Sequence, residues 1–226
     1  MINKIWVFGH SFCLPFNLED NDNSWTVKLA NRLGLSFENF SEPGADNLFI
    51  YHAYRTVLKR IRPEDIVIIG WSHPSRKSFV LDQENPRHTE VSQKGLLYEC
   101  GSHKFFRSNN PTSYGSNNWL NFKPKKKGLL FYDDWFNNYY SEYEQKLNFQ
   151  SYIDSVVQTC PGIYLPFYFN QESVSGINTH DTDPKFMVEF IKENNIKLNK
   201  TDMHMNNKGH DLWSEVMHQK YLTMLK

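Results

Sequence analysis

The stretch KIWVFGHSF, residues 4–12, combines five residues typical of a buried strand with Gly9, His10 and Ser11 directly after them. Such a strand holds the chain in the core, and a glycine permits a sharp turn in which a Cβ would clash. Open α/β sheets bind their ligands at the carboxyl ends of the strands. The stretch therefore predicts either a nucleophilic serine at the end of a strand or an ordinary turn, since Gly and Ser are also common turn residues.

Strand-like and helix-like segments alternate after this stretch. Apolar residues spaced four apart predict a helix that begins after Ser24 and stops at Gly34, and residues 35–40 alternate like a second strand. A second helix is expected over residues 48–61. Residues 66–70 read IVIIG, a run of branched apolar residues typical of a parallel strand buried on both faces. This alternation predicts an α/β fold, a three-layer α/β/α sandwich with a mainly parallel sheet.

Composition limits the choice of class. The chain has 226 residues, the length of a single domain spanning 1–226. Lys+Arg and Asp+Glu both total 25, so no net charge favours nucleic acid or an anionic membrane as a partner. No apolar run approaches the roughly 18 residues of a membrane span, and no signal peptide is recognisable, so a cytoplasmic location is expected. Three widely spaced cysteines indicate neither a disulfide framework nor a metal site, and no cofactor is expected.

The C-terminal segment TDMHMNNKGH, residues 201–210, precedes a helical pattern. Asp202 stands two residues before His204, so one loop can hold both an acid and a base. With Ser11 arriving from another strand, these residues supply the nucleophile, the base and the orienting carboxylate of a hydrolytic triad.

Short blocks spread over nearly the whole chain resemble the SGNH (GDSL) hydrolase superfamily. Residues 9–12 resemble its first block, which usually reads Gly-Asp-Ser, and residues 201–210 resemble its last, Asp-x-His with a downstream Gly. Residues 43–47, PGADN, resemble the second block, and residues 70–73, GWSH, stand where the third usually reads Gly-x-Asn-Asp. The resemblance implies the flavodoxin-like fold of that superfamily and ester hydrolysis.

The resemblance also implies roles for single residues. Ser11 corresponds to the nucleophile, Asp202 to the orienting carboxylate and His204, five residues before Gly209, to the base. His210 follows that glycine, where a packing role is usual.

An oxyanion hole is implied as well, formed by the backbone N–H groups of Ser11 and Gly44. The third block carries Ser72 where an asparagine is expected, so the additional side-chain donor is either Ser72 or Asn47. Three further residues within these motif blocks are expected to bind the substrate: His10, Trp71 and His73.

Residues 74–128 look like a long insertion after the third strand, rich in polar residues and scattered aromatics, with no periodic stretch. The insertion predicts one of two arrangements. It is a cap whose aromatic residues stack on a substrate, or its aromatic residues form a satellite cluster that packs on the core. The lysine-rich run at 123–127 predicts a solvated loop or, alternatively, a phosphate- or nucleic-acid-binding patch. Residues 128–159 predict a helix that can break near Asn148, and residues 196–198 a short last strand.

The sequence thus predicts a serine ester hydrolase, an acylesterase or acetylesterase acting through an acyl-enzyme on a small-molecule or glycan ester such as an O-acylated carbohydrate. A degenerate glycan-binding or structural relative is the alternative, because Ser72 replaces the usual asparagine. Cysteine chemistry at Cys13 is a third possibility. The run THDTD at residues 179–183 contains residue types that bind metals, but Asp183 before Pro184 fits an N-cap better, and no metal is expected.

Overall fold

The computed structural model describes residues 3–15, 24–74, 76, 78–81, 97–100, 103–107, 141–198 and 204–225. Its central sheet has four parallel strands in the order β2-β1-β3-β7. The bounds of these strands are β1 Lys4–Phe8, β2 Ser36–Asn39, β3 Ile66–Trp71 and β7 Ile163–Tyr168. The predicted parallel α/β sheet is confirmed.

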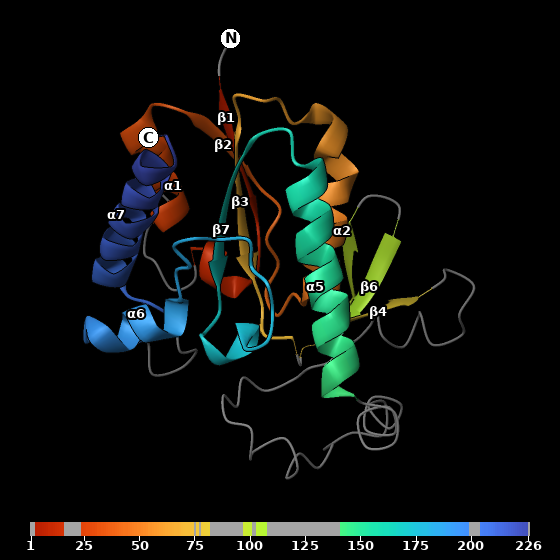
Figure 1. Ribbon diagram of the computed structural model, residues 1–226. Helices are drawn as coiled ribbons and strands as arrows, with labels where there is room; N and C mark the ends of the chain where they lie inside the picture. Colours follow the sequence, from red (N-terminus) through yellow and green to blue (C-terminus); the bar gives the residue numbers. More distant parts are fainter. Residues whose placement is uncertain are drawn as a thin grey trace.

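Helices cover both faces of this sheet (Figure 1). One face carries α1 (Trp25–Leu33), α6 (Met187–Glu193) and α7 (Asn207–Met224). The opposite face carries α2 (Asn47–Val57) and α5 (Glu142–Thr159). Short 3₁₀ turns follow β1, α2 and β7: η1 (Ser11–Cys13), η3 (Leu58–Arg60) and η6 (Glu172–Val174). The three predicted layers are therefore present.

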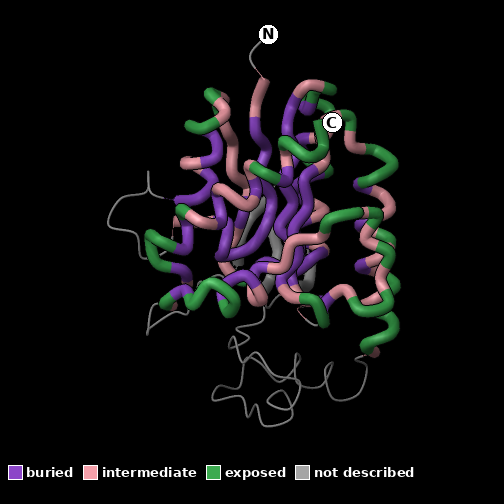
Figure 2. Tube along the Cα trace, turned by 60° about the vertical axis from the view of Figure 1, so that its left-hand side comes forward, coloured by how far each residue is buried: buried purple, intermediate pink, exposed green. Residues whose placement is uncertain are grey.

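The strands β1, β3 and β7 contribute alternate side chains to two separate cores. On β1, Ile5 and Val7 pack toward α1 and α7, whereas Trp6 and Phe8 pack toward α2 and α5. All six residues of β3 are buried. Figure 2 shows the strands as a buried centre, with exposed residues on the outer sides of the helices. Burial on both faces is the reason that β3 reads as a continuous apolar run instead of an alternating one.

The first predicted helix lies where the sequence places it. Ser24 Oγ accepts a hydrogen bond from the Val27 N–H and caps α1. Gly34 ends the helix in the left-handed conformation, with φ +66°, which a residue without a Cβ adopts at little cost. Among the described helices, none has the length and apolar character needed to cross a membrane.

Three expectations differ from the structure. The helix over 128–159 is described from Glu142 and continues through Asn148 without a break. The predicted strand at 196–198 is an isolated bridge between Leu198 and Met205. The expectation of no regular structure in the insertion is wrong for its described part, where β4 (Ser78–Leu81), β5 (Leu97–Cys100) and β6 (His103–Arg107) form an antiparallel sheet.

Strands this short carry too few residues to display a period, and they are stabilised by pairing with distant partners. The sheet has the order β4-β6-β5, and β5 contacts α2. The lysine run at 123–127 lies outside the described residues, as does most of the remaining insertion.

Candidate active site

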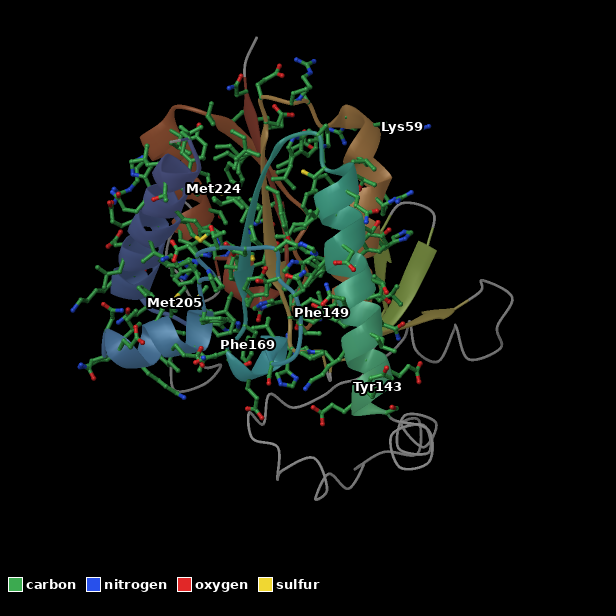
Figure 3. The ribbon with its side chains drawn as sticks, viewed as in Figure 1. Lys59, Tyr143, Phe149, Phe169, Met205 and Met224 are labelled. Atoms are coloured by element: carbon green, nitrogen blue, oxygen red, sulfur yellow. The ribbon has the colours of Figure 1, made fainter. Side chains whose placement is uncertain are left out.

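Several loops meet at the carboxyl edge of the central sheet, the lower edge in Figure 1. The turn after β1 carries Ser11, the loop after β2 carries Gly44, and Ser72 directly follows β3. His204 lies on the segment that precedes α7. Figure 3 shows that Met205, which directly follows His204, lies toward the same edge as Phe169, which follows β7. The fold thus gathers residues from four distant parts of the chain at one edge.

Hydrogen bonds from two neighbouring elements hold the turn that carries Ser11. The Phe12 carbonyl accepts from the Trp25 indole N–H of α1 at 2.7 Å. The Cys13 carbonyl accepts from the Asn39 amide at the end of β2 at 2.8 Å. A Cβ on Gly9 would lie 2.4 Å from the Cys13 sulfur, so close packing requires a glycine there. Ser11 is 8% exposed at the start of this fixed turn.

The loop after β2 lies against the same turn. Its Glu42 N–H donates to the Gly9 carbonyl at 3.1 Å, and Gly44 adopts a left-handed conformation with φ +75°. Within the described residues, no hydrogen bond uses the backbone N–H of Ser11 or of Gly44. Both groups can therefore donate to an oxygen that develops negative charge beside Ser11.

The second and third motif loops are joined by Asn47. Its side-chain oxygen accepts from the Ser72 N–H at 2.8 Å, and its amide nitrogen donates to the Ser72 carbonyl at 3.0 Å. The Ser72 hydroxyl is buried and has no hydrogen-bond partner among the described residues. Of the two residues considered for the side-chain donor, Asn47 thus positions the Ser72 backbone, and Ser72 retains an uncommitted hydroxyl.

His204 lies beside the turn of Ser11. Its ring centroid is 5.0 Å from that of Phe12, the residue directly after the serine. The helix that follows is capped by Asn206, whose side-chain oxygen accepts from the Gly209 N–H at 3.0 Å. Asp202, predicted to orient His204, lies outside the described residues, which omit 199–203.

His210, in the first turn of α7, makes a structural contact with α1. Its Nδ1 accepts from the Trp25 N–H at 3.1 Å, at the start of α1. The same tryptophan bonds the Phe12 carbonyl, so His210, Trp25 and the serine turn form one connected support. Sequence reasoning missed Trp25, because no local pattern reveals which carbonyl a helix-terminal indole will meet.

Two of the residues expected to bind substrate, Trp71 and His10, lie in the protein interior. Trp71 is fully buried, packs on Phe149 and donates its indole N–H to the Tyr164 hydroxyl, so it belongs to the core beneath α5. His10 has 0% exposure, and its ring packs against those of Phe12 and Phe169, which also contact each other. The expected substrate contacts of Trp71 and His10 are wrong, because both rings point into the protein.

The burial of His10 also determines its charge. Burial holds the pKa of His10 well below its usual value, and the positive charges of Arg76 and His204 lower it further. Neither ring nitrogen has a hydrogen-bond partner among the described residues, and the Trp71 backbone, which favours protonation, only partly opposes the lowering of the pKa. A neutral imidazole therefore stands where the motif that residues 9–12 resemble has an aspartate.

His73 lies at the edge of the site and is only partly buried. Its ring is 6.5 Å from that of Phe169. Burial lowers the pKa of His73, and the positive charge of Arg76 adds to this effect. Its role in binding substrate stays a prediction. Phe169 and Arg76, which both contact this region, were not singled out from the sequence.

Cysteine chemistry is contradicted by the position of Cys13. The side chain has 0% exposure, and burial raises the pKa of its thiol to about 12. A thiol that stays protonated at neutral pH is a poor nucleophile. Its sulfur fills the space beside Gly9 and Gly70, where it contributes to packing.

The run at residues 179–183 is engaged in ion pairs. His180 Nε2 lies 2.8 Å from an Asp154 oxygen, and Lys220 pairs with Asp181. Among the described residues, no group of three or more His, Cys, Asp or Glu side chains is arranged to hold a metal ion. These residues hold the loop after β7 against α5 and α7.

We expect His210 to make the protein less stable in mild acid. Burial, with smaller effects from the charges of Lys28 and His204, lowers the pKa of His210 from 6.5 to about 4. Between these values the unfolded chain binds a proton that the folded one does not. The free energy of unfolding should therefore fall, by on the order of 3 kcal/mol for this residue, as the pH drops from about 6.5 to 4.

Urea unfolding at several pH values measures this effect. His210→Asn keeps an acceptor for the Trp25 N–H and cannot be protonated in this range. The unfolding free energy of the wild type minus that of the variant should fall by on the order of 3 kcal/mol as the pH drops from about 6.5 to 4. An unchanged difference across the range would contradict the assignment.

Comparisons with known proteins show which solved structures have a similar architecture. No protein-family model matches the chain, and no curated protein matches its sequence. The solved structure of the esterase EstA from Pseudoalteromonas sp. has a TM-score of 0.53 at 12% identity, covering 99% of this chain and 98% of that one. TesA gives a TM-score of 0.51 at 11% identity, with 99% and 98% coverage. A lipase, Lip_vut3 from a goat rumen metagenome, gives 0.50 at 11% identity, with 98% and 96% coverage. By these likenesses and the parallel order of its sheet, the chain has the fold of the SGNH (GDSL) hydrolases.

Proposed function

We propose that the protein is a serine ester hydrolase with Ser11 as nucleophile, His204 as general base and Asp202 as the orienting carboxylate. The observation that carries the proposal is the 5.0 Å contact between the rings of His204 and Phe12. It brings an imidazole from the C-terminal segment to the turn of a serine located near the N-terminus. The supporting hydrogen bonds from Trp25 and Asn39 keep that turn in place.

In the acylation step, the Ser11 oxygen attacks the ester carbonyl carbon while His204 removes the hydroxyl proton. The carbonyl oxygen becomes an oxyanion in the tetrahedral intermediate. When this intermediate collapses, the bond to the alcohol oxygen breaks, and the imidazolium returns its proton to the leaving alcohol. Ser11 is left as an ester of the acyl group. Asp202 stabilises the transient positive charge on the imidazole.

The oxyanion is stabilised by donors from three loops. The backbone N–H groups of Ser11 and Gly44 are uncommitted among the described residues, and the Ser72 hydroxyl supplies the third donor. Asn47 fixes the Ser72 backbone through its two hydrogen bonds. Donors that are held in place before the reaction need no reorganisation as charge develops.

Deacylation repeats the chemistry with water as the nucleophile. His204 removes a proton from the water as it attacks the acyl carbon, and then returns that proton to the Ser11 oxygen. The acid is released and the serine is restored. The expected substrates are small acyl esters, including acetyl groups on carbohydrate.

A binding protein without catalysis is the second candidate. The observation that favours it is the third motif loop, where the family's amide donor is replaced by the Ser72 hydroxyl and the nearby Asn47 amide is bonded to the Ser72 backbone. A lost oxyanion donor costs about 3–4 kcal/mol of transition-state stabilisation. On this alternative the same edge of the sheet would bind a glycan without cleaving it.

Covalent labelling separates the two candidates. The EstA structure is described as inhibited by monoethylphosphonate, and a fluorophosphonate probe tests for the same type of reaction here. We expect mass spectrometry of the labelled protein to locate one adduct on Ser11, and His204→Ala to slow labelling strongly because the serine then lacks its base. Absence of any adduct at high probe concentration would favour the binding protein, and an adduct on another residue would contradict the assignment of Ser11.

A further inference from the structure

A pocket lies between the start of α2 and the first turns of α5, next to the motif loops. Asn47, Arg76, Gln145, Asn148 and Phe149 are among the residues that line it. Figure 3 shows Phe149 on the side of α5 that faces the sheet. Because Asn47 also binds the Ser72 backbone, the pocket shares a wall with the candidate oxyanion hole.

The pocket offers hydrogen-bond donors. Gln145 is 6% exposed, and its amide nitrogen is buried with no hydrogen-bond partner among the described residues. Arg76 and Asn148 add a guanidinium and an amide to the lining. Tyr152 is a phenol that stays protonated, because burial, with the charge of Asp46 adding to it, raises its pKa to about 12. A buried donor without an acceptor is costly, so this wall is suited to a ligand that accepts hydrogen bonds.

Arg76 also connects the pocket to the serine turn. Its guanidinium carbon lies 5.7 Å from the centroid of the Phe169 ring. That ring lies 5.9 Å from the ring of His10 and 6.1 Å from the ring of Phe12. One aromatic ring thus separates the guanidinium from the two residues that flank Ser11.

The surrounding charges are of both signs. Asp46 lines the same pocket, where its carboxylate caps α2 by accepting from the Phe49 N–H at 2.9 Å. Glu142 and Glu172 contribute negative charge near His73, and Lys146 contributes positive charge. A ligand here would therefore be recognised by directed donors rather than by a general positive field. The planar fork of a guanidinium matches the two oxygens of a carboxylate.

We propose that this pocket binds a carboxylate carried by the substrate, so that the preferred substrates are esters with a free carboxylate close to the ester bond. This inference rests on the proposed ester hydrolysis at Ser11. Arg76 pairs with the carboxylate and the Gln145 amide donates to it, while the ester carbonyl lies beside Ser11.

Paired substrates test the proposal and show which half of the ester carries the charge. For the alcohol half, 4-acetoxybenzoate is compared with its methyl ester; for the acyl half, the 4-methylumbelliferyl monoester of adipic acid is compared with its methyl ester. Rates are divided by those of hydroxide-catalysed hydrolysis to remove differences in intrinsic reactivity. We expect the anionic member of at least one pair to have a kcat/KM at least tenfold higher, mainly through a lower KM.

Arg76→Gln should reduce the ratio of kcat/KM for the anionic ester to kcat/KM for its methyl ester to about one, and Gln145→Leu should reduce this ratio in part. Arg55→Gln is the matched control, because Arg55 also lies over an aromatic ring, 5.9 Å from the centroid of Tyr51, but on the exposed side of α2. Its ratio should equal that of the wild type. Ratios near one in both pairs, or a ratio that Arg76→Gln leaves unchanged, would overturn the carboxylate site while leaving ester hydrolysis standing.

Binding is measured separately, so that the outcome does not depend on turnover. Titration of 4-hydroxybenzoate and of its methyl ester, followed by protein NMR, should show tighter binding of the carboxylate, lost in Arg76→Gln. If no ester is hydrolysed, the proposed function fails, and selective binding of the carboxylate would still support the pocket. Equal or undetectable binding of both compounds would refute it.

Discussion

Ser11→Ala is expected to lower kcat/KM for ester hydrolysis by several orders of magnitude, up to about 10⁶-fold, because only the roughly 10³–10⁴-fold acceleration over water that the oxyanion donors and binding provide would remain. The variant lacks the only protein atom that forms a covalent bond with the acyl carbon in the proposed mechanism. The rate is measured with 4-nitrophenyl acetate, after subtraction of spontaneous hydrolysis and with protein purified free of other esterases.

Ser214→Ala provides the control for this experiment. Ser214 is also a fully buried serine, but its hydroxyl donates to the Asp211 carbonyl within α7, away from the serine turn. The esterase activity of Ser214→Ala should remain close to that of the wild type. Both variants should melt within a few degrees of the wild type, since neither removes apolar volume from the core. Wild-type activity in Ser11→Ala would eliminate Ser11 as the nucleophile.

Lys220→Met should reduce the free energy of unfolding by about 3–5 kcal/mol, the usual cost of removing one partner from a buried ion pair. Lys220 is 3% exposed, pairs with Asp181 and donates to the Asp183 carbonyl at 3.0 Å. Burial lowers the pKa of Lys220, and the opposite charge of Asp181 counteracts this effect. Without the lysine, the Asp181 carboxylate would be left buried and uncompensated.

Lys185→Met is the matched control for Lys220→Met. Lys185 pairs with Asp183 at 2.7 Å in the same loop, but its side chain is 30% exposed and that of its partner 49%. Exposed pairs contribute about 0–1 kcal/mol, so its loss should be small. Urea unfolding curves measure both variants. Similar small losses for the two substitutions would show that the Lys220 pair is no more important than a surface contact.

Much of the fold was predictable because it depends on local pattern. The apolar run of β3 predicted a strand buried on both faces, and Ser24 and Gly34 marked the ends of α1. The motif blocks located Ser11 and His204, which the fold brings to one edge. In each case the signal lies within a few neighbouring residues, where periodicity, capping and turn geometry act.

Tertiary structure alone decided the contacts between distant segments. Asn47 and Ser72 are 25 positions apart and exchange two hydrogen bonds, and Trp71 faces the core instead of the substrate. Arg76 and Phe169 meet at the site although 93 positions separate them. Local patterns show which residue types alternate, but the partner of a given side chain depends on how the layers pack. For this reason the sequence determined the layers and the position of Ser11 at the end of β1, and the packing of those layers determined what surrounds this serine.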